Sequence, residues 1–349
     1  MKLVGILGLP GSGKTTLFEI LTQGAGVSAP GHGGREHVGV VQVPDERLDR
    51  LAALFRKKGV HARIQFVDSA AAGHEGRPAA KGTDLFAGVR NCDALVVVVR
   101  DFENPAVPVE GNVDPERDLR AVETELVLND LAIVETRLER IEREFRVGKR
   151  QSEHERAPLV RCRELLESER PLRGEPLDAE TDRLLRGFQL LTRKPLLVVY
   201  NQDERSQRAP RAPGPGALAL ALRAQLEREI VALPPEERAA FRAELGATED
   251  GLSLVIHACY RLLGLISFFT VGSDEVRAWA LRGGAHAVEA AGEVHTDFAH
   301  GFIRAEVIGW RELIEAGGTA AARAKGILRL EGRDYVVRDG DCIEIRFGR

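Results

Sequence analysis

The sequence has few cysteines and no long apolar run, so it has neither the disulfide pattern of a secreted protein nor the apolar segment of a membrane-spanning one. Only four of its 349 residues are cysteines, and these lie far apart with no CxxC or cysteine–histidine spacing. Single thiols of this kind indicate a reducing compartment, for which the cytoplasm is the default. No apolar run approaches the ~20 residues that span a bilayer, and the apolar stretch at 3–9 is too short and glycine-broken for a signal peptide.

The chain also lacks an excess of charge of either sign. Its formal net charge is −4, although 29% of its residues are charged. This balance argues against a protein that coats nucleic acid by bulk electrostatics, while a local basic patch could be hidden in the average. Apolar residues make up 44% of the chain, which is too many for a disordered protein. At ~100–200 residues per domain, the length predicts two or three domains.

Short apolar runs of β type recur through the first two hundred residues, at 2–7, 38–43, 64–67, 94–99 and 196–200. The run at 94–99 is unbroken, which is typical of a central strand buried on both faces. Helical patterns separate several of these runs. The sequence therefore predicts the α/β fold class, with a mostly parallel sheet covered by helices.

A helical region interrupts this pattern between about 115 and 193. Its first part carries an apolar stripe with the heptad-like spacing 3, 4, 3, 4, at Leu131, Val134, Leu138, Ile141 and Phe145. Two further helical stretches follow. We interpret the region as an antiparallel helical arm of coiled-coil type inserted into the α/β domain, and an ordinary layer of helices is the alternative.

The last part of the chain, from about residue 275, has a different pattern of residues. Short strands are expected at 302–307, 327–330, 335–337 and 342–347, with turn residues such as Arg338-Asp339-Gly340 between them. This pattern predicts a small α+β module with a core of its own.

The first strand is followed by a full GxxxxGK[ST] motif in the strand–loop–helix context that a phosphate-binding loop requires. Its glycines let backbone N–H groups turn toward phosphate oxygens, where the helix N-terminus adds partial positive charge. Lys14 would neutralise the β- and γ-phosphates, and the hydroxyl of Thr15 can ligate Mg²⁺. The alternative is a glycine turn without a ligand. The predicted nucleotide-binding residues here are Gly8, Pro10, Gly11, Ser12, Gly13, Lys14, Thr15 and Thr16.

Two further strand ends supply candidate site residues. Asp68 closes the strand at 64–67, where a P-loop protein places the acid that holds the magnesium shell. A turn or helix cap is the alternative for this residue. The strand at 196–200 is followed by Asn201 and, three positions on, Glu204, where a loop that selects the base is expected. An ordinary polar loop is the alternative.

Several stretches together resemble the Obg-like ATPase (YchF) family of P-loop proteins, over nearly the whole chain. A phosphate-binding loop alone is shared by thousands of proteins, whereas its combination with this C-terminal sequence is narrow. The matching stretches lie at 8–16, 41–48, 66–68, 98–103, 191–204, 295–307 and 330–337.

The resemblance implies three parts. These are a P-loop nucleotide-binding domain of the GTPase type at 1–115 and 194–268, a coiled-coil arm at 116–193, and a TGS-type, ubiquitin-like module at 269–349. It also implies ATP rather than GTP, because the guanine-selecting NKxD loop of related GTPases is replaced here by NxxE at Asn201 and Glu204. The family is associated with ribosomes, and the arm and the TGS module are the expected contact surfaces, with the large subunit as the expected partner.

The sequence departs from the family in the two switch regions. Ala71 stands where the glycine of DxxG contacts the γ-phosphate, and Gly33 where a threonine senses Mg²⁺. Arg223 replaces a serine of the base-binding region. These changes put γ-phosphate sensing and hydrolysis in question. Three histidines lie in or beside the switches, and solvated loop residues are expected there rather than catalytic ones: His32, His37 and His74.

The leading functional hypothesis is a cytoplasmic nucleotide switch that binds ATP and ADP with Mg²⁺, hydrolyses ATP slowly and associates with ribosomes or ribonucleoprotein. Neither a membrane nor a specific DNA sequence is expected as a partner. A hydrolysis-deficient, nucleotide-sensing binding module is the second hypothesis, supported by Ala71 and Gly33. A small-molecule P-loop kinase ranks last, because it gives no reason for a TGS-like C-terminal module.

Overall fold

The computed structural model describes the chain except for residues 24–28, 31–35, 70–85, 108–110, 246–249 and 349. The chain divides into two units. The first consists of Lys2–Val40 and Gln65–Val255, and the second of Val41–Ile64 and Ile256–Arg349 together with Met1. Among the described residues, no helix is both long and apolar enough to cross a membrane.

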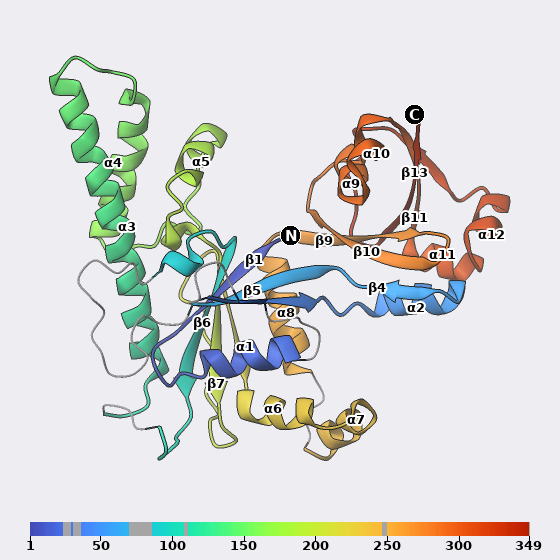
Figure 1. Cartoon of the computed structure of the whole chain (residues 1–349), viewed down its shortest axis with the longest axis horizontal. Coiled ribbons are helices and arrows are strands. Elements are labelled where there is room, and N and C mark those ends of the chain that lie inside the picture. Colours follow the sequence, from blue (N-terminus) through green and yellow to red (C-terminus); the bar gives the residue numbers. More distant parts are fainter. Residues whose placement is uncertain (24–28, 31–35, 70–85, 108–110, 246–249, 349) are drawn as a thin grey trace. The chain divides into compact units, whose positions relative to one another are not determined.

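A seven-stranded sheet forms the centre of the first unit (Figure 1), in the order β2-β3-β5-β1-β6-β7-β8. Strand β1 pairs in parallel with β5 and β6, β6 with β7, and β7 with β8, whereas β2 is antiparallel to β3. This arrangement confirms the predicted mostly parallel α/β sheet. The strands are β1 Leu3–Leu7, β2 Ala29–Pro30, β3 Glu36–Gln42, β5 Arg63–Ser69, β6 Ala94–Asp101, β7 Leu196–Gln202 and β8 Ala217–Leu222.

The helices of the first unit cover this sheet and form the predicted insertion. They are α1 Lys14–Gln23, α3 Pro115–Arg146, α4 Glu153–Glu167, α5 Ala179–Arg186, α6 Ala224–Ala232 and α7 Pro235–Glu244, with short 3-10 turns at Ala87–Val89 and Leu191–Arg193. Helix α8, Gly251–Leu262, begins in the first unit and ends in the second.

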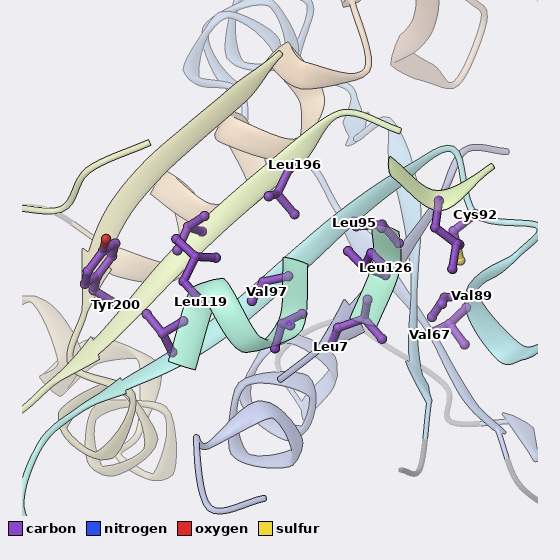
Figure 2. Close-up of a cluster of buried hydrophobic side chains, with 14 residues drawn as sticks. Leu7, Val67, Val89, Cys92, Leu95, Val97, Leu119, Leu126, Leu196 and Tyr200 are labelled. Atoms are coloured by element: carbon purple, nitrogen blue, oxygen red, sulfur yellow. The ribbon is translucent and has the colours of Figure 1, made fainter. Parts of the chain in front are cut away.

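The core of the first unit lies between the sheet and the first half of α3. All eight residues of β6 are buried, as its unbroken apolar run predicted. Val97 of β6 and Leu196 of β7 belong to the same buried cluster as Leu119 and Leu126 of α3 (Figure 2). Cys92 is buried in this cluster as well.

The second half of α3 forms a helical hairpin with α4, which is the predicted arm. Val134, Leu138 and Ile141 of the predicted stripe are buried in a separate apolar cluster with residues of α4. Phe145, the last member of the stripe, is 46% exposed, because α3 ends one residue later and α4 begins only at residue 153. The stripe therefore ends one heptad position earlier than the spacing predicts.

The buried carboxylate of Asp130 anchors the segment that leads from the arm back to the sheet. Asp130 of α3 is fully buried and accepts hydrogen bonds from the backbone N–H groups of Leu191 and Thr192 and from the Thr192 hydroxyl, at 2.9, 2.7 and 2.6 Å. Burial raises the pKa of Asp130, and these three hydrogen bonds oppose the shift. The carboxylate thereby satisfies backbone donors that the turn before β7 would otherwise bury without partners.

The second unit contains a six-stranded sheet in the order β12-β11-β13-β9-β10-β4, whose core includes buried residues of α9, with Phe298 of α10 packed against it. Its strands are β4 Lys58–Val60, β9 Leu265–Val271, β10 Glu275–Arg282, β11 Phe302–Gly309, β12 Arg329–Glu331 and β13 Asp341–Phe347. Its helices are α2 Glu46–Phe55, α9 Ala287–Val294, α10 Thr296–His300, α11 Trp310–Ala316 and α12 Thr319–Ala324.

The prediction of a strand at 335–337 in this unit is wrong. Val336 makes only an isolated bridge with His286. The backbone groups of Tyr335 and Val337 bond to Ala287 and Ala285. Because α9 begins at residue 287, the partner segment turns into a helix before a second bridge can form.

The segment 41–64 belongs to the second unit although it lies between two strands of the first. Its strand β4 pairs in parallel with β10. Arg47 of α2 donates to both carboxylate oxygens of Asp45, at 2.8 Å each, and to Asp339 at 2.7 Å. Burial opposes its charge, but the two carboxylates raise the pKa of Arg47. This ion pair holds α2 against the turn before β13.

We expect Asp130→Ala to lower the free energy of unfolding by about 3 kcal/mol, because it leaves three buried donors unsatisfied. The matched control is Asp178→Ala, since Asp178 also accepts three hydrogen bonds, from Glu180 and Thr181, but is exposed. Urea unfolding followed by far-UV circular dichroism measures both variants. An equal loss in the two variants would contradict the anchoring role of Asp130.

Candidate functional site

The turn between β1 and α1 carries the predicted phosphate-binding motif. Gly11 and Gly13 have φ angles of +76° and +94°, in the left-handed region where glycine alone is unstrained. A Cβ atom on Gly13 would lie 2.3 Å from Nδ2 of Asn201, and one on Gly8 would lie 2.6 Å from the carbonyl oxygen of Val98. The turn therefore requires glycine both for its backbone conformation and for its close approach to neighbouring segments.

The first turn of α1 has the features of an anion-binding site. A helix leaves its first four N–H groups without intrahelical acceptors, and α1 begins at Lys14. The Lys14 side chain is buried, which lowers its pKa, and the negative charge of Asp68 partly offsets that shift. The Ser12 hydroxyl is buried and has no hydrogen-bond partner within the described ranges. A phosphate oxygen in this turn would satisfy these groups together.

Thr15, in the first turn of α1, and Asp68 are the residues predicted to ligate Mg²⁺, and this assignment remains a prediction. Asp68 lies near the end of β5, opposite Ile6 of β1, and is buried. Hydroxyl and carboxylate oxygens suit Mg²⁺. No group of three His, Cys, Asp or Glu side chains that could hold a metal occurs in the described part of the chain. Mg²⁺ here would therefore share its coordination with phosphate and water, as is usual for this ion.

Asn201 ties the phosphate-binding turn to the far edge of the sheet. Its Nδ2 donates to the carbonyl oxygen of Ser12 at 3.0 Å, and its Oδ1 accepts from the backbone N–H of Ala224 at 3.1 Å. The side chain is buried, so these bonds are shielded from water. The described contacts give Asn201 an anchoring role, and the predicted direct contact with a base remains a prediction.

A cavity of about 520 Å³ opens over this turn. It has the size expected of a nucleotide or cofactor site. One side is formed by the phosphate-binding turn and the start of α1, and the others by the loops after β6 and β7 and by α6. Its lining residues are Gly11, Gly13, Lys14, Thr15, Thr16, Phe102, Glu103, Asn104, Val107, Asn201, Gln202, Asp203, Ala224, Gln225 and Arg228.

Two buried residues at the end of β6 hold the cavity loops in place. The guanidinium of Arg100 donates to the carbonyl oxygens of Phe102 and Val107, at 3.1 and 2.7 Å. Asp101 accepts from Gln202 at 2.8 Å and from the hydroxyl of Ser206 at 2.7 Å. The loop after β6 and the loop after β7 are therefore both organised from one strand end.

The loop after β7 brings Asp203, rather than Glu204, to the cavity. Glu204 is exposed and lines an adjoining hollow. Burial works against ionisation of Asp203, but hydrogen bonds from the backbone N–H groups of Glu103, Arg205 and Ser206 lower its pKa overall. Asp203 thus presents an ionised carboxylate at the cavity wall, and the predicted contact of Glu204 with a base remains a prediction.

Six further residues were singled out in the sequence for their places in the switch regions or the base-binding region. Gly33, Ala71, His32 and His74 lie outside the described residues. The other two are exposed: His37, whose ring centroid is 6.3 Å from that of Phe18, and Arg223, which precedes α6 and makes no side-chain cap hydrogen bond.

Comparisons with known proteins agree with this geometry. The chain is 39% identical to the ribosome-binding ATPase YchF of Bacillus subtilis (strain 168), over 98% of each chain. It is 38% identical to the protein of the same name from Escherichia coli O157:H7, again over 98% of each. The chain belongs to the YchF family.

Two further likenesses support membership of the YchF family. The family model YchF-GTPase_C, described as a protein of unknown function (DUF933), matches residues 265–348. The solved structure of the Schizosaccharomyces pombe YchF GTPase superposes with a TM-score of 0.81 at 28% identity, covering 99% of this chain and 97% of that one. The predicted fold class, a GTPase-like α/β sheet with a helical insertion and a C-terminal TGS-type module, is confirmed.

Four cavity or loop residues of this YchF-family chain were missed by the sequence reasoning. Arg100 and Asp101 end a buried strand, and their position in a matching stretch was the only signal available. Asp203 and Arg228 belong to no spacing rule, since one lies in a polar loop and the other on the surface of α6. Only their spatial neighbours show that Asp203 and Arg228 line the cavity and that Arg100 and Asp101 hold its loops.

We expect Asp203→Asn to weaken nucleotide binding at least fivefold, because a carboxylate at the cavity wall that also orders its loop loses its charge. Glu204→Gln is the matched control, and it should stay within twofold because Glu204 is exposed and lies off the cavity. Isothermal titration of each variant with ATP and with GTP measures the effect. The reverse order would support the base contact that the NxxE spacing predicts.

Nucleotide affinity should also decline at alkaline pH sooner than an ordinary lysine would allow. Burial lowers the pKa of Lys14 from 10.5, so the ammonium that faces phosphate is lost as the pH rises through that lowered value. Titrations with ADP between about pH 7 and pH 10 test this sign. An affinity that stays constant over the whole range would contradict a role for the Lys14 charge.

Proposed function

We propose that this protein is a nucleotide switch that binds ATP and ribosomes and hydrolyses ATP slowly. The observation that carries the proposal is the turn at 8–15, where the buried Lys14 lines a cavity of nucleotide size and the buried hydroxyl of Ser12 has no hydrogen-bond partner among the described residues. The name "ribosome-binding ATPase" of the bacterial relatives, at 38–39% identity over 98% of the chain, supports both halves of the proposal.

The phosphates would be held by the turn and by the start of α1, through Gly8, Pro10, Gly11, Ser12, Gly13, Lys14, Thr15 and Thr16. Thr15 and Asp68 would hold Mg²⁺, which would neutralise charge that develops on the β- and γ-phosphates. Asn201 would keep the turn in register with the base loop, whose Asp203 lines the cavity and whose Glu204 is the alternative contact for the base. Catalysis would consist of positioning and electrostatics, because no described side chain at the cavity is an evident general base.

ATP is proposed over GTP because the loop after β7 reads Asn201-Gln202-Asp203-Glu204 and lacks the NKxD sequence that accepts from guanine. The names of the relatives differ here, since the bacterial proteins are called ATPases and the fission-yeast protein a GTPase. Nucleotide preference is therefore a separate measurement.

A hydrolysis-deficient, nucleotide-sensing module of the same fold is the second candidate. The substitutions at Gly33 and Ala71 favour it, because these positions sense Mg²⁺ and the γ-phosphate in the family that the sequence resembles. Binding through Lys14 and Thr15 would survive these changes, whereas closure around the γ-phosphate would not.

We further propose that the arm at 116–193 and the C-terminal module at 269–349 are the ribosome-binding parts, with the large subunit as partner and the cytoplasm as location. The nucleotide-binding domain would then comprise 1–115 and 194–268. Residues 41–64, which lie within 1–115, belong to the same compact unit as the C-terminal residues.

Single-turnover hydrolysis of ATP, with and without purified ribosomes, tests the proposal. We expect phosphate release that ribosomes accelerate and that Lys14→Ala reduces at least tenfold, because the ammonium facing the phosphates is lost. Release no faster than in Lys14→Ala would leave the binding module as the function. Tighter binding of GTP than of ATP in a parallel titration would overturn the assignment of the base loop.

A further inference from the structure

The turn that joins α3 to α4 is locally basic, whereas the chain as a whole carries a net negative charge. We call residues 145–152 the arm tip, which lies at the end of the helical hairpin far from β6 and β7 (Figure 1). The arm tip contains three basic residues and no acidic one, in a protein whose net charge is −4. It also contains two apolar side chains that are widely exposed, Phe145 at 46% and Val147 at 71%.

Two acidic residues near the arm tip, Glu144 and Glu155, are held by other side chains of the arm. Arg137 holds Glu155 through two hydrogen bonds of 2.7 Å, which lower the pKa of this carboxyl. Glu144 accepts from the Ser152 hydroxyl at 2.9 Å and from Arg140 at 3.1 Å. These bonds brace the two helix ends, and they leave both carboxylates committed to side chains of the arm.

The three basic side chains of the arm tip, by contrast, make no ion pair with any described residue. They are Arg146, Lys149 and Arg150, and all three are exposed. The guanidinium of Arg150 lies over the ring of Phe145, with its carbon 5.1 Å from the ring centroid. This contact orders an arginine without neutralising it, so its N–H donors stay available to a partner.

Helix stability explains only part of this arrangement. Basic side chains near a helix C-terminus are favoured by the helix dipole, which accounts for Arg146 in the last turn of α3. Gly148, at φ +78°, ends the helix, with its N–H bonded to Phe145 and the next N–H to Glu144. Neither effect requires a cation at Lys149 or Arg150, or an exposed ring at Phe145.

We propose that the arm tip binds folded RNA, with Arg146, Lys149 and Arg150 on backbone phosphates and Phe145 against an unpaired base. This inference rests on the proposed association with ribosomes and names the surface and the chemistry of the contact. Guanidinium and ammonium groups with an exposed aromatic ring are the combination that recognises phosphate and base together. The end of a helical hairpin is convex, which suits a groove or loop of RNA.

Anisotropy titrations of the full chain with a fluorescein-labelled RNA hairpin test the proposal between 50 and 200 mM KCl. The triple variant Arg146→Ala, Lys149→Ala, Arg150→Ala should bind at least about tenfold more weakly at low salt, and its slope of log affinity against log salt should fall by about two to three. Phe145→Ala should bind roughly tenfold more weakly with an unchanged slope, because it removes stacking rather than charge.

The matched control removes three exposed arginines that are paired within the arm: Arg161→Ala, Arg170→Ala, Arg186→Ala. It changes the net charge by the same amount, and circular dichroism verifies that both triple variants are folded. Equal affinities and slopes for the two variants would overturn the proposal. It would also be overturned if the hairpin fails to bind while a polyglutamate peptide binds, since the partner would then be an acidic protein.

Cosedimentation with ribosomes separates this inference from the function on which it rests. We expect the wild type to pellet with ribosomes and the tip variant to pellet at least tenfold less. If the variant pellets like the wild type, the arm tip is not the contact, although ribosome binding stands. If the wild type stays in the supernatant, the proposed function itself fails.

Discussion

A single buried amide holds the candidate nucleotide site together. Asn201 links Ser12, 189 residues earlier in the chain, to Ala224, 23 residues later. Because the amide uses a donor toward one segment and its acceptor toward the other, it can be replaced by neither a carboxylate nor an apolar residue without leaving a buried group unsatisfied. Its close approach also explains why residue 13 must be glycine.

The other parts of the first unit are arranged around the same strand ends. Arg100 and Asp101, at the end of β6, order the loops on both sides of the cavity. Arg208 then bonds to Asp101 at 3.3 Å and to Glu116, in the first turn of α3, at 2.8 Å. The guanidinium of Arg208, in the segment after β7, therefore links the end of β6 to the start of α3. Helix α3 continues without a break from there to the arm tip.

Much of the fold was predictable because its signals are local. The unbroken apolar run of β6 indicates a strand buried on both faces. The motif between β1 and α1 indicates a turn that only glycine can make. The last position of the arm stripe and the strand at 335–337 could not be predicted in the same way. In both cases the pattern was right for the element, but the partner segment ended before it could pair.

The residues of the candidate site likewise divide into those that a local sequence pattern reveals and those that only the folded structure reveals. The phosphate-binding turn was evident because its chemistry resides in consecutive residues. Asp203 was missed because a polar loop offers two carboxylates and only the folded loop decides which one faces the cavity.

The sequence by itself determined the fold class, the phosphate-binding turn and the existence of a helical insertion, since each follows from the residue types and periodicity of one segment. Tertiary structure decided how Asn201 is used, that residues 41–64 pack with the C-terminal unit, and which charges of the arm stay unpaired. These properties depend on groups brought together from distant positions. A side chain's neutralisation or exposure is set by such neighbours, which no local pattern encodes.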